Sequence, residues 1–388
     1  MSKLHEIPWV IDEHTKVKHQ LLGNYINLWM SILFFTQKKY GWKQQLLYFD
    51  GFAGPGIYWV NEDKKETTPG SPIIVANLAN SFLERDPKRV IQIKCIDVKK
   101  ECVEYLSDEL SKVNKFKQDW IVEQESFNDA VNKLLDNHQQ SNDPIPPSFY
   151  FIDPFGYTGF PIETLKRILA FERTELFINF MIYDINRFAE ESHAREHMIE
   201  LFGCDRFEEL QTIQSPEERC KFLVSLYRNQ LAAYAGAKYT LPFRINTPGM
   251  GSRPKYFLIH AFNHIKALRL MKDEMAKLSQ QPYRFEAIGI DDHGQLNLFE
   301  PPEKVAIKNS IYDYFCGNNI NDFIPYRDIE DWAYQFTAGI SRDIKEAIME
   351  LEKEGKIQIQ RAKGQKKTTV TEKAQIKFLN KKMMSAAK

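Results

Sequence analysis

Two short apolar segments, at 48–56 and 149–156, share one design and constrain the fold more than any other feature. Each is a run of aromatic and aliphatic residues that ends in an aspartate, Asp50 or Asp153, before a turn with glycine and proline. Apolar runs of this kind are typical of strands in an open parallel sheet, which binds ligands at the carboxyl ends of its strands. The pattern predicts an α/β fold with a binding cleft at one edge of the sheet.

Helix and strand patterns alternate along the first part of the chain, which indicates βαβ units and a parallel sheet. The helix predicted over 68–84 has Ser71 as a candidate N-cap before Pro72. The predicted strands are 46–50, 90–97, 120–124, 149–153, 175–183 and 255–261, and the other helices are 14–38, 99–114, 127–138, 162–170 and 264–278. This order predicts a Rossmann-like class I methyltransferase sheet with an antiparallel finish, in a domain over 1–290 with a helical insertion at 189–235.

A second domain is predicted after a linker at 291–302, where glycine, asparagine and paired prolines show little periodicity. Within 303–388, three helical patterns at 305–315, 326–337 and 341–354 precede two short strands at 357–361 and 368–371. Three helices followed by a β-hairpin is the order of a winged helix-turn-helix domain. Gly355 fits the C′ position of the third helix, and the turn that would form the wing contains Lys363, Lys366 and Lys367.

Charge and composition narrow the classes of function. The 52 Lys and Arg residues balance 52 Asp and Glu residues over the 388-residue chain. From 351 to 388, however, eleven Lys and Arg face three Glu, and a local basic surface can bind phosphates. The five scattered cysteines have no metal-binding spacing, so no zinc cluster or disulfide framework is expected. No apolar run suits a membrane span or a secretory signal, so we expect a cytoplasmic protein without a membrane partner.

The first acid-ended turn is a candidate cofactor site. Its glycines leave the turn nearly free of side chains, so backbone N–H groups can approach a ligand closely. Asp97, at the end of the next strand, can accept hydrogen bonds from both hydroxyls of a ribose, and residues 123–126 can meet an adenine amino group. A purely structural turn would look the same as the glycine turn. The residues predicted to bind S-adenosylmethionine (SAM) are Asp50, Gly51, Ala53, Gly54, Gly56, Asp97, Glu125 and Ser126.

The second acid-ended turn is a candidate reacting centre. Asp153-Pro154-Phe155-Gly156 resembles the (Asp/Asn/Ser)-Pro-Pro-(Tyr/Phe) signature of methyltransferases that act on exocyclic base nitrogens, and more closely the Asp-Pro-Phe-Gly of tRNA N2-guanine dimethyltransferases. An aromatic amine is a poor nucleophile because its lone pair is delocalised into the ring. The Asp153 carboxylate and the Pro154 carbonyl would accept the two amine protons and direct the lone pair to the methyl group. Phe155 would stack on a flipped or unpaired base.

Two features of this motif leave alternatives open. An Asp-Pro sequence after a strand is also a good turn, and Phe155 replaces the second proline of the commoner signature, which leaves the base and its nitrogen open. Further candidates for substrate binding follow the fifth predicted strand or flank a loop near residue 250. Structural roles are expected for two histidines: His260 as a buried, hydrogen-bonded side chain and His264 as a helix cap. The substrate candidates are Gly156, Asn179, Asp184, Asn186, Arg187, Arg244, Arg253 and Lys255, with Lys363, Lys366 and Lys367 of the wing.

Several unusual motifs occur together in the order of a known family. These motifs are 14–19 with Leu21, Leu22 and Tyr25, 50–56, 70–72, 151–156, Asn179-Phe180 with 184–187, and 256–261. Over about 10–280 the chain resembles the three-Cys-motif partner (TcmP) proteins. The resemblance implies a methyltransferase-like fold that acts beside a three-Cys-motif protein encoded nearby, in a bacterium or phage. The winged helix is predicted from this sequence alone.

Three functions fit these observations. The first is a SAM-dependent methyltransferase that modifies an exocyclic amine of a DNA or RNA base. The second is a non-catalytic scaffold for the three-Cys-motif partner that binds nucleic acid through its winged helix. The third, a small-molecule or peptide methyltransferase with a winged-helix dimerisation module, is disfavoured because such enzymes place the helical module before the catalytic domain.

Overall fold

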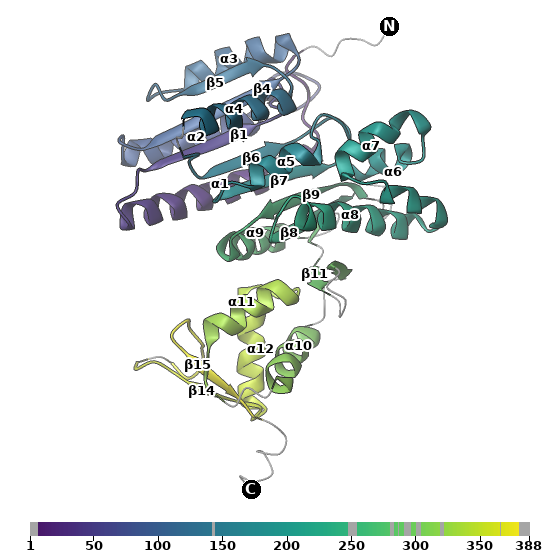
Figure 1. The fold of residues 1–388 in the computed structure, drawn as a ribbon. Coiled ribbons are helices and arrows are strands. Elements are labelled where there is room, and N and C mark those ends of the chain that lie inside the picture. Colours follow the sequence, from purple (N-terminus) through teal and green to yellow (C-terminus); the bar gives the residue numbers. More distant parts are fainter. Residues whose placement is uncertain are drawn as a thin grey trace. The chain divides into compact units, whose positions relative to one another are not determined.

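The chain forms two compact units, Met1–Arg284 and Phe285–Lys388, in a computed structural model (Figure 1). The structure describes residues 7–141, 144–246, 254–279, 283–285, 287–290, 296–299, 304–318, 322–364 and 366–379. Each unit has its own buried core. None of the helices in these ranges has the length and apolar character that crossing a membrane requires.

The first unit is built on an eight-stranded sheet with the order β10-β8-β9-β7-β6-β1-β4-β5. Its strands are β1 (Gln45–Asp50), β4 (Val90–Asp97), β5 (Trp120–Gln124), β6 (Ser148–Ile152), β7 (Thr174–Phe180), β8 (Tyr239–Asn246), β9 (Pro254–Phe262) and β10 (Tyr283–Phe285). Neighbours from β5 to β7 are parallel, whereas β9 is antiparallel to both β7 and β8. The α/β fold with a mostly parallel sheet is therefore confirmed, and so is the late antiparallel strand.

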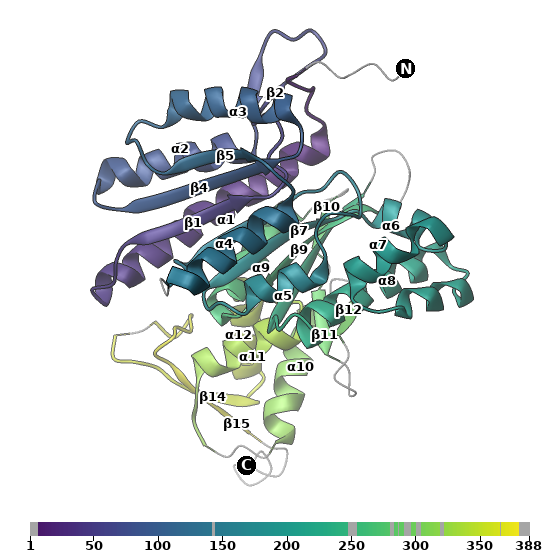
Figure 2. The same ribbon diagram turned by 45° about the horizontal axis from the view of Figure 1, so that its top comes forward.

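Two helical layers cover this sheet (Figure 2). In one layer, α9 (Ile265–Leu278), α1 (Glu13–Lys39), α2 (Ser71–Arg85) and α3 (Lys100–Val113) pack in that order. In the other, α5 (Ile162–Leu169) packs between α4 (Phe127–Ser141) and α8 (Pro216–Ala233). The segment 189–235 is helical and contains η1 (Ser192–Ala194), α7 (Arg195–Phe202), η2 (Arg206–Thr212) and α8. Burial on both faces explains why β1 and β6 are made mostly of apolar and aromatic residues.

Two predicted elements of the first unit were wrong in their bounds. The strand predicted over 175–183 ends at Phe180, and α6 (Ile182–Phe188) begins two residues later. Ile182 and Ile185 are buried three residues apart, which is helical spacing. The helix predicted from 68 begins at Ser71, because Thr67–Pro69 form β3 and pair with β2 (Ile57–Trp59). Gly70 is the N-cap instead of Ser71.

In its described residues, the second unit contains three helices, a three-stranded antiparallel sheet in the order β13-β15-β14, and a two-stranded sheet of β11 (Ala287–Ile290) and β12 (Leu296–Phe299). Its elements are α10 (Lys304–Gly317), β13 (Ile324–Pro325), α11 (Tyr326–Phe336), α12 (Ser341–Lys353), β14 (Ile357–Gln360) and β15 (Gln375–Phe378). The core includes Ile311, Ile348 and Ile376, all fully buried. Gly355 has φ +68° directly after the C-cap of α12, as predicted.

One predicted strand of the second unit was wrong in its position. The second hairpin strand, predicted over 368–371, lies at β15, where Ile376 and Phe378 alternate with more exposed residues. Of the predicted linker 291–302, the structure describes only β12 (Leu296–Phe299), which pairs antiparallel with β11 (Ala287–Ile290). The rest of that segment lies outside the described residues.

The turn after β1 is packed against the first unit's own side chains. A Cβ atom on Gly51 would lie 2.4 Å from a ring carbon of Phe127, and Phe127 also stacks on Phe52. A Cβ atom on Gly56, which has φ +71°, would lie 2.4 Å from Leu106. These glycines are therefore required by close packing of the protein itself.

We expect Gly51→Ala to lower the free energy of unfolding by roughly 1–3 kcal/mol, since the added methyl group overpacks a rigid aromatic contact. Urea unfolding followed by tryptophan fluorescence measures this loss. Gly317→Ala is the control, because a Cβ atom there meets nothing within 4 Å. An unchanged midpoint for Gly51→Ala would contradict the packing explanation.

Candidate functional site

Three acidic residues mark one edge of the sheet. Asp50 and Asp97 are the last residues of β1 and β4, and Asp153 directly follows β6. Because β6, β1 and β4 are adjacent and parallel, their carboxyl ends lie at the same edge. Burial differs among the three: Asp50 is fully buried and Asp97 almost so, whereas 18% of the Asp153 side chain is exposed. Asp153 is thus the acid that solvent or a ligand can reach.

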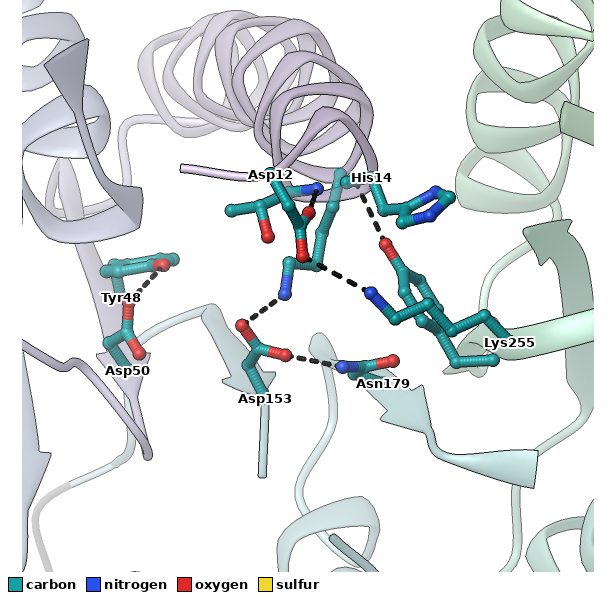
Figure 3. A network of polar contacts seen from close by, with 10 residues as sticks. Asp12, His14, Tyr48, Asp50, Asp153, Asn179 and Lys255 are labelled. Atoms are coloured by element: carbon teal, nitrogen blue, oxygen red, sulfur yellow. Dashed lines mark hydrogen bonds and ion pairs between the residues drawn. The ribbon is translucent and has the colours of Figure 1, made fainter. Parts of the chain in front are cut away.

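Asp153 is held by two side chains from different elements (Figure 3). The ammonium of Lys18, on α1, lies 2.5 Å from Oδ2 of Asp153. The amide of Asn179, on β7, donates to Oδ1 at 2.6 Å, while the Oδ1 of Asn179 is buried with no hydrogen-bond partner among the described residues. The carboxylate is therefore fixed in orientation, and an unused acceptor lies beside it.

A second ion pair flanks the first (Figure 3). Lys255 on β9 lies 3.2 Å from Oδ2 of Asp12, which is also the N-cap of α1 and accepts from the Thr15 amide at 2.6 Å. Burial opposes ionisation of Asp12, but the Thr15 amide and Lys255 lower its pKa overall. The start of α1 is thereby tied to the first residues of β9, at the same edge of the sheet as Asp153.

A cavity of about 1260 Å³ opens over this network. Its lining includes residues from the N-terminal segment, the start of α1, the turns after β1, β4 and β6, and strands β7 and β9. The lining residues are Ile7, Pro8, Trp9, Val10, Ile11, Asp12, Thr15, Lys18, Phe52, Tyr58, Glu62, Lys64, Lys99, Glu101, Asp153, Pro154, Phe155, Asn179, Met181, Lys255 and Tyr256. The three predicted catalytic residues and Asn179 are all in this lining.

The predicted cofactor residues do not line the cavity; only Phe52 of their turn does. The Asp97 carboxylate accepts from the backbone amides of Gly54, at 2.9 Å, and Lys99, at 2.8 Å, and the Ala53 amide bonds to the Ile96 carbonyl. Ser126 caps α4 through Asp129, and Glu125 lies 3.8 Å from Lys133. These side chains shape the edge of the sheet.

Asp50 has a distinct environment. Its Oδ2 accepts from the Tyr48 hydroxyl at 2.9 Å, and the Ser71 hydroxyl also bonds to the carboxyl group. Its Oδ1 is buried and has no hydrogen-bond partner in the described ranges. Burial raises the pKa of Asp50 to about 7, although the Ser71 and Tyr48 hydroxyls oppose the shift. Asp50 itself does not line the cavity, whereas Phe52, two residues later, does. A buried carboxyl with a raised pKa at the end of a strand is a candidate for a binding role.

The remaining substrate candidates are dispersed. Asp184, Asn186 and Arg187 lie on α6, where Asn186 accepts from Arg219 at 3.0 Å and Arg187 lies over the Phe188 ring. Gly156 follows Phe155 but is not in the cavity lining. Buried Arg244 pairs with Glu217 at 2.8 Å, so its charge is already compensated. Arg253 lies outside the described residues, and Lys363, Lys366 and Lys367 are exposed in the second unit.

The two histidine predictions are confirmed. His260 is fully buried and bonded to Glu175 at 2.8 Å, and the His264 side chain caps α9 by accepting from the Lys266 amide. Within the described residues, no group of three or more His, Cys, Asp or Glu side chains is placed to hold a metal ion.

Three residues of the cavity escaped sequence reasoning as functional candidates: Lys18, Trp9 and Lys99. Lys18 lies in the 14–19 motif on which the resemblance to the TcmP proteins rests, but its ion-pair partner, Asp153, is 135 positions away along the chain. The spacing of α1 did offer one signal, because Lys18 lies on the face that also holds buried Leu21, Leu22 and Tyr25. A lysine on a buried helical face needs an acidic partner.

Comparison with known proteins gives no family assignment. The chain matches no protein-family model and no curated protein. Among solved structures, it is similar to a Legionella pneumophila protein described under family model DUF519, with 12% identity and a TM-score of 0.33, over 62% of this chain and 85% of that one. It is also similar to WbdD, with 11% identity and a TM-score of 0.32, over 66% of this chain and 41% of that one. Likeness at this level says nothing about substrate or activity.

The raised pKa of Asp50 predicts a pH-dependent stability. The unfolded carboxyl ionises near 3.8, whereas the folded one keeps its proton up to about 7. The folded state then binds more protons in this window, so its free energy of unfolding should fall as pH rises from about 4 to 7, by up to roughly 4 kcal/mol. Asp50→Asn should flatten this dependence. Urea unfolding at pH 5 and pH 8 measures it, and parallel changes in both proteins would refute the assignment.

Proposed function

We propose that this chain is a SAM-dependent methyltransferase that acts on an exocyclic amine of a nucleic-acid base. The observation that carries the proposal is the placement of Asp153. Its carboxylate lines a large cavity at the carboxyl end of β6, is oriented by Lys18 and Asn179, and precedes Pro154 and the 69% exposed ring of Phe155. An oriented acceptor beside a stacking surface is what an exocyclic amine requires.

The proposed methyl transfer uses lone pairs of Asp153 that its described contacts do not occupy. An ionised carboxylate offers about four lone-pair positions, and the described contacts of Asp153 occupy one on each oxygen. Asp153 and the Pro154 carbonyl would accept hydrogen bonds from the two amine N–H groups, so that the nitrogen lone pair is available for attack on a methyl group. As the N–C bond forms, the methyl–sulfur bond of the donor would break with its electron pair left on sulfur, and Asp153 would take one amine proton. The ion pair with Lys18 keeps Asp153 in place during this step, which favours catalysis through pre-organisation.

The residues present fit a SAM cofactor in part. Asp50 has a buried oxygen without a partner, which suits the cationic amino group of such a ligand, and Phe52 beside it lines the cavity. Asp97 keeps lone pairs beyond its two backbone contacts and can still meet ribose hydroxyls. The reversed β9 next to β8 supports the predicted class I methyltransferase sheet. When bound, SAM would supply the activated methyl group.

The second unit supports a nucleic-acid substrate. Its three helices and three-stranded sheet agree with the winged helix-turn-helix proposed for it. Residues 304–354 carry six Lys and Arg against ten Asp and Glu, whereas 355–379 carry seven against one. The positive charge is therefore concentrated in the hairpin, which would contact phosphates and not read bases.

One observation favours a second candidate function, that of a non-catalytic scaffold. The positions that Cβ atoms of Gly51, Gly56 and Gly70 would occupy are already filled by Phe127, Leu106 and Tyr58. A turn filled in this way also suits a non-catalytic scaffold that binds nucleic acid and a three-Cys-motif protein. Capture of that protein together with the absence of methyl transfer would favour the scaffold.

The first test is methyl transfer itself. We expect wild-type protein to bind SAM in calorimetry and to transfer tritiated methyl groups to total DNA or RNA. Asp153→Asn should bind SAM within a fewfold of wild type and lose transfer by roughly 100-fold or more, because one amine acceptor is lost. No heat on addition of SAM to the wild type would refute the proposal.

A matched double variant separates folding from chemistry. Asp153→Asn alone leaves Lys18 buried without a counter-charge, which is destabilising. Asp153→Asn with Lys18→Met removes both charges and should recover thermal stability, yet remain inactive. Recovery of activity in the double variant would show that Asp153 acts only as a partner for Lys18.

The hairpin lysines give a separate prediction. Replacing Lys363, Lys366 and Lys367 together with Ala should weaken binding to DNA or RNA of any sequence, and lower the slope of log K against log salt concentration by about two to three. Filter binding between 50 and 200 mM salt measures both. Lys112→Ala, on exposed α3, is the control, and an unchanged slope in the triple variant would exclude the hairpin from phosphate binding.

A further inference from the structure

Three side chains from distant parts of the chain meet at the wall of the cavity: Trp9, Phe155 and Lys99. The Trp9 and Phe155 rings pack edge to face, with centroids 5.5 Å apart. The ammonium of Lys99 lies 5.1 Å from the Trp9 centroid and 5.2 Å from the Phe155 centroid. All three residues line the cavity that contains Asp153. We refer to them as the Trp9 cluster.

The aromatic part of the Trp9 cluster is poorly covered by the protein. Phe155 is 69% exposed, although it directly follows Pro154 at the reacting centre. Its contacts with Trp9 and Lys99 hold the ring in place while leaving much of its surface open. A fixed, exposed aromatic ring at a cavity wall suits a flat ligand, and nucleobases stack on such rings with little regard to their identity.

Lys99 differs from two other lysines of the cavity. Lys18 is paired with Asp153 and Lys255 with Asp12. For Lys99, the described residues supply two aromatic rings and no ion pair. Contact with aromatic rings leaves a positive charge uncompensated. The ammonium is therefore available to a ligand anion, a few ångströms from the rings that suit a base.

We propose that the Trp9 cluster binds one unpaired nucleotide of a single-stranded DNA or RNA segment. The base stacks on Phe155, supported by Trp9, and a phosphate contacts Lys99. This inference rests on the proposed function, because it names the substrate form that the same site takes. A base in a duplex is stacked on both sides and cannot present its face to Phe155, so the site requires a flipped or single-stranded base.

The size of the cavity agrees with this assignment. Pockets for drug-sized ligands enclose about 300–1,000 Å³, and this cavity encloses about 1260 Å³. One nucleotide beside Phe155 therefore leaves space for a second ligand. Asp153 and Asn179 lie in the same lining, where the polar edge of a stacked base would meet the Asp153 carboxylate.

Binding of a short single-stranded oligonucleotide tests the inference. The full chain with Lys363, Lys366 and Lys367 replaced by Ala serves as background, so that hairpin contacts do not mask the site. Fluorescence anisotropy of a labelled six-nucleotide probe, DNA and RNA in turn, gives the affinity. Phe155→Ala should weaken it about 5- to 150-fold, the range that one base–aromatic stack supports. Lys99→Met should weaken binding and lower the salt slope by about one.

A matched control is present on α1. Phe35 is 70% exposed, as Phe155 is, but lies about 30 Å along the helix from Thr15 of the cavity lining. Phe35→Ala should leave affinity unchanged, and circular dichroism should show that every variant is folded. Equal losses for Phe35→Ala and Phe155→Ala, a duplex probe that binds as tightly as the single strand, or affinities within twofold of the background for both Phe155→Ala and Lys99→Met would each overturn the inference.

The outcome separates the two proposals. Probe binding that depends on Phe155 and Lys99, with no methyl transfer, supports the nucleotide site and rejects the enzyme. Methyl transfer to nucleic acid that is insensitive to Phe155→Ala and Lys99→Met supports the enzyme and rejects the nucleotide site.

Discussion

The ion pair between Lys18 and Asp153 is the interaction on which the candidate site depends. Only 7% of the Lys18 side chain and 18% of the Asp153 side chain are exposed, so both charges have lost much of their hydration. Such a pair contributes little net stability, but removal of one partner leaves a buried charge uncompensated. Its main effect is geometric, because it fixes helix α1 over the end of β6.

The same pair organises the surrounding elements. Asp153 also accepts from Asn179 on β7, and Asp12 at the start of α1 pairs with Lys255 on β9. The N-terminal end of helix α1 is thus joined directly to Asp153 after β6 and to Lys255 on β9, and through Asp153 to Asn179 on β7. A carboxylate held in this way has one orientation before any ligand arrives, which favours positioning over flexibility.

The sequence predicted local features of the fold better than its long-range contacts. β4 and β5 have their predicted bounds, because both contain several β-branched or aromatic residues and are followed by helical patterns. The boundary between β7 and α6 was predicted wrongly, because the chain changes from strand to helix at a single residue, Met181, within an apolar run. It also missed Lys18 and Trp9, which contact Asp153 and Phe155 far along the chain, because periodicity carries no information about such contacts.

The glycine turn shows why a motif alone could not decide the cofactor site. Its glycines permit close approach, but the approaching groups include Phe127, Leu106 and Tyr58 of the same chain. The structure adds a different feature, the buried Oδ1 of Asp50, which has no hydrogen-bond partner among the described residues and which no sequence pattern reveals. A buried carboxyl whose pKa is raised to about 7 is costly to ionise. A cationic group of a ligand next to this carboxyl would lower the free-energy cost of its ionisation. The Asp50 carboxylate, which is costly to form in the free protein, would then be stabilised by binding.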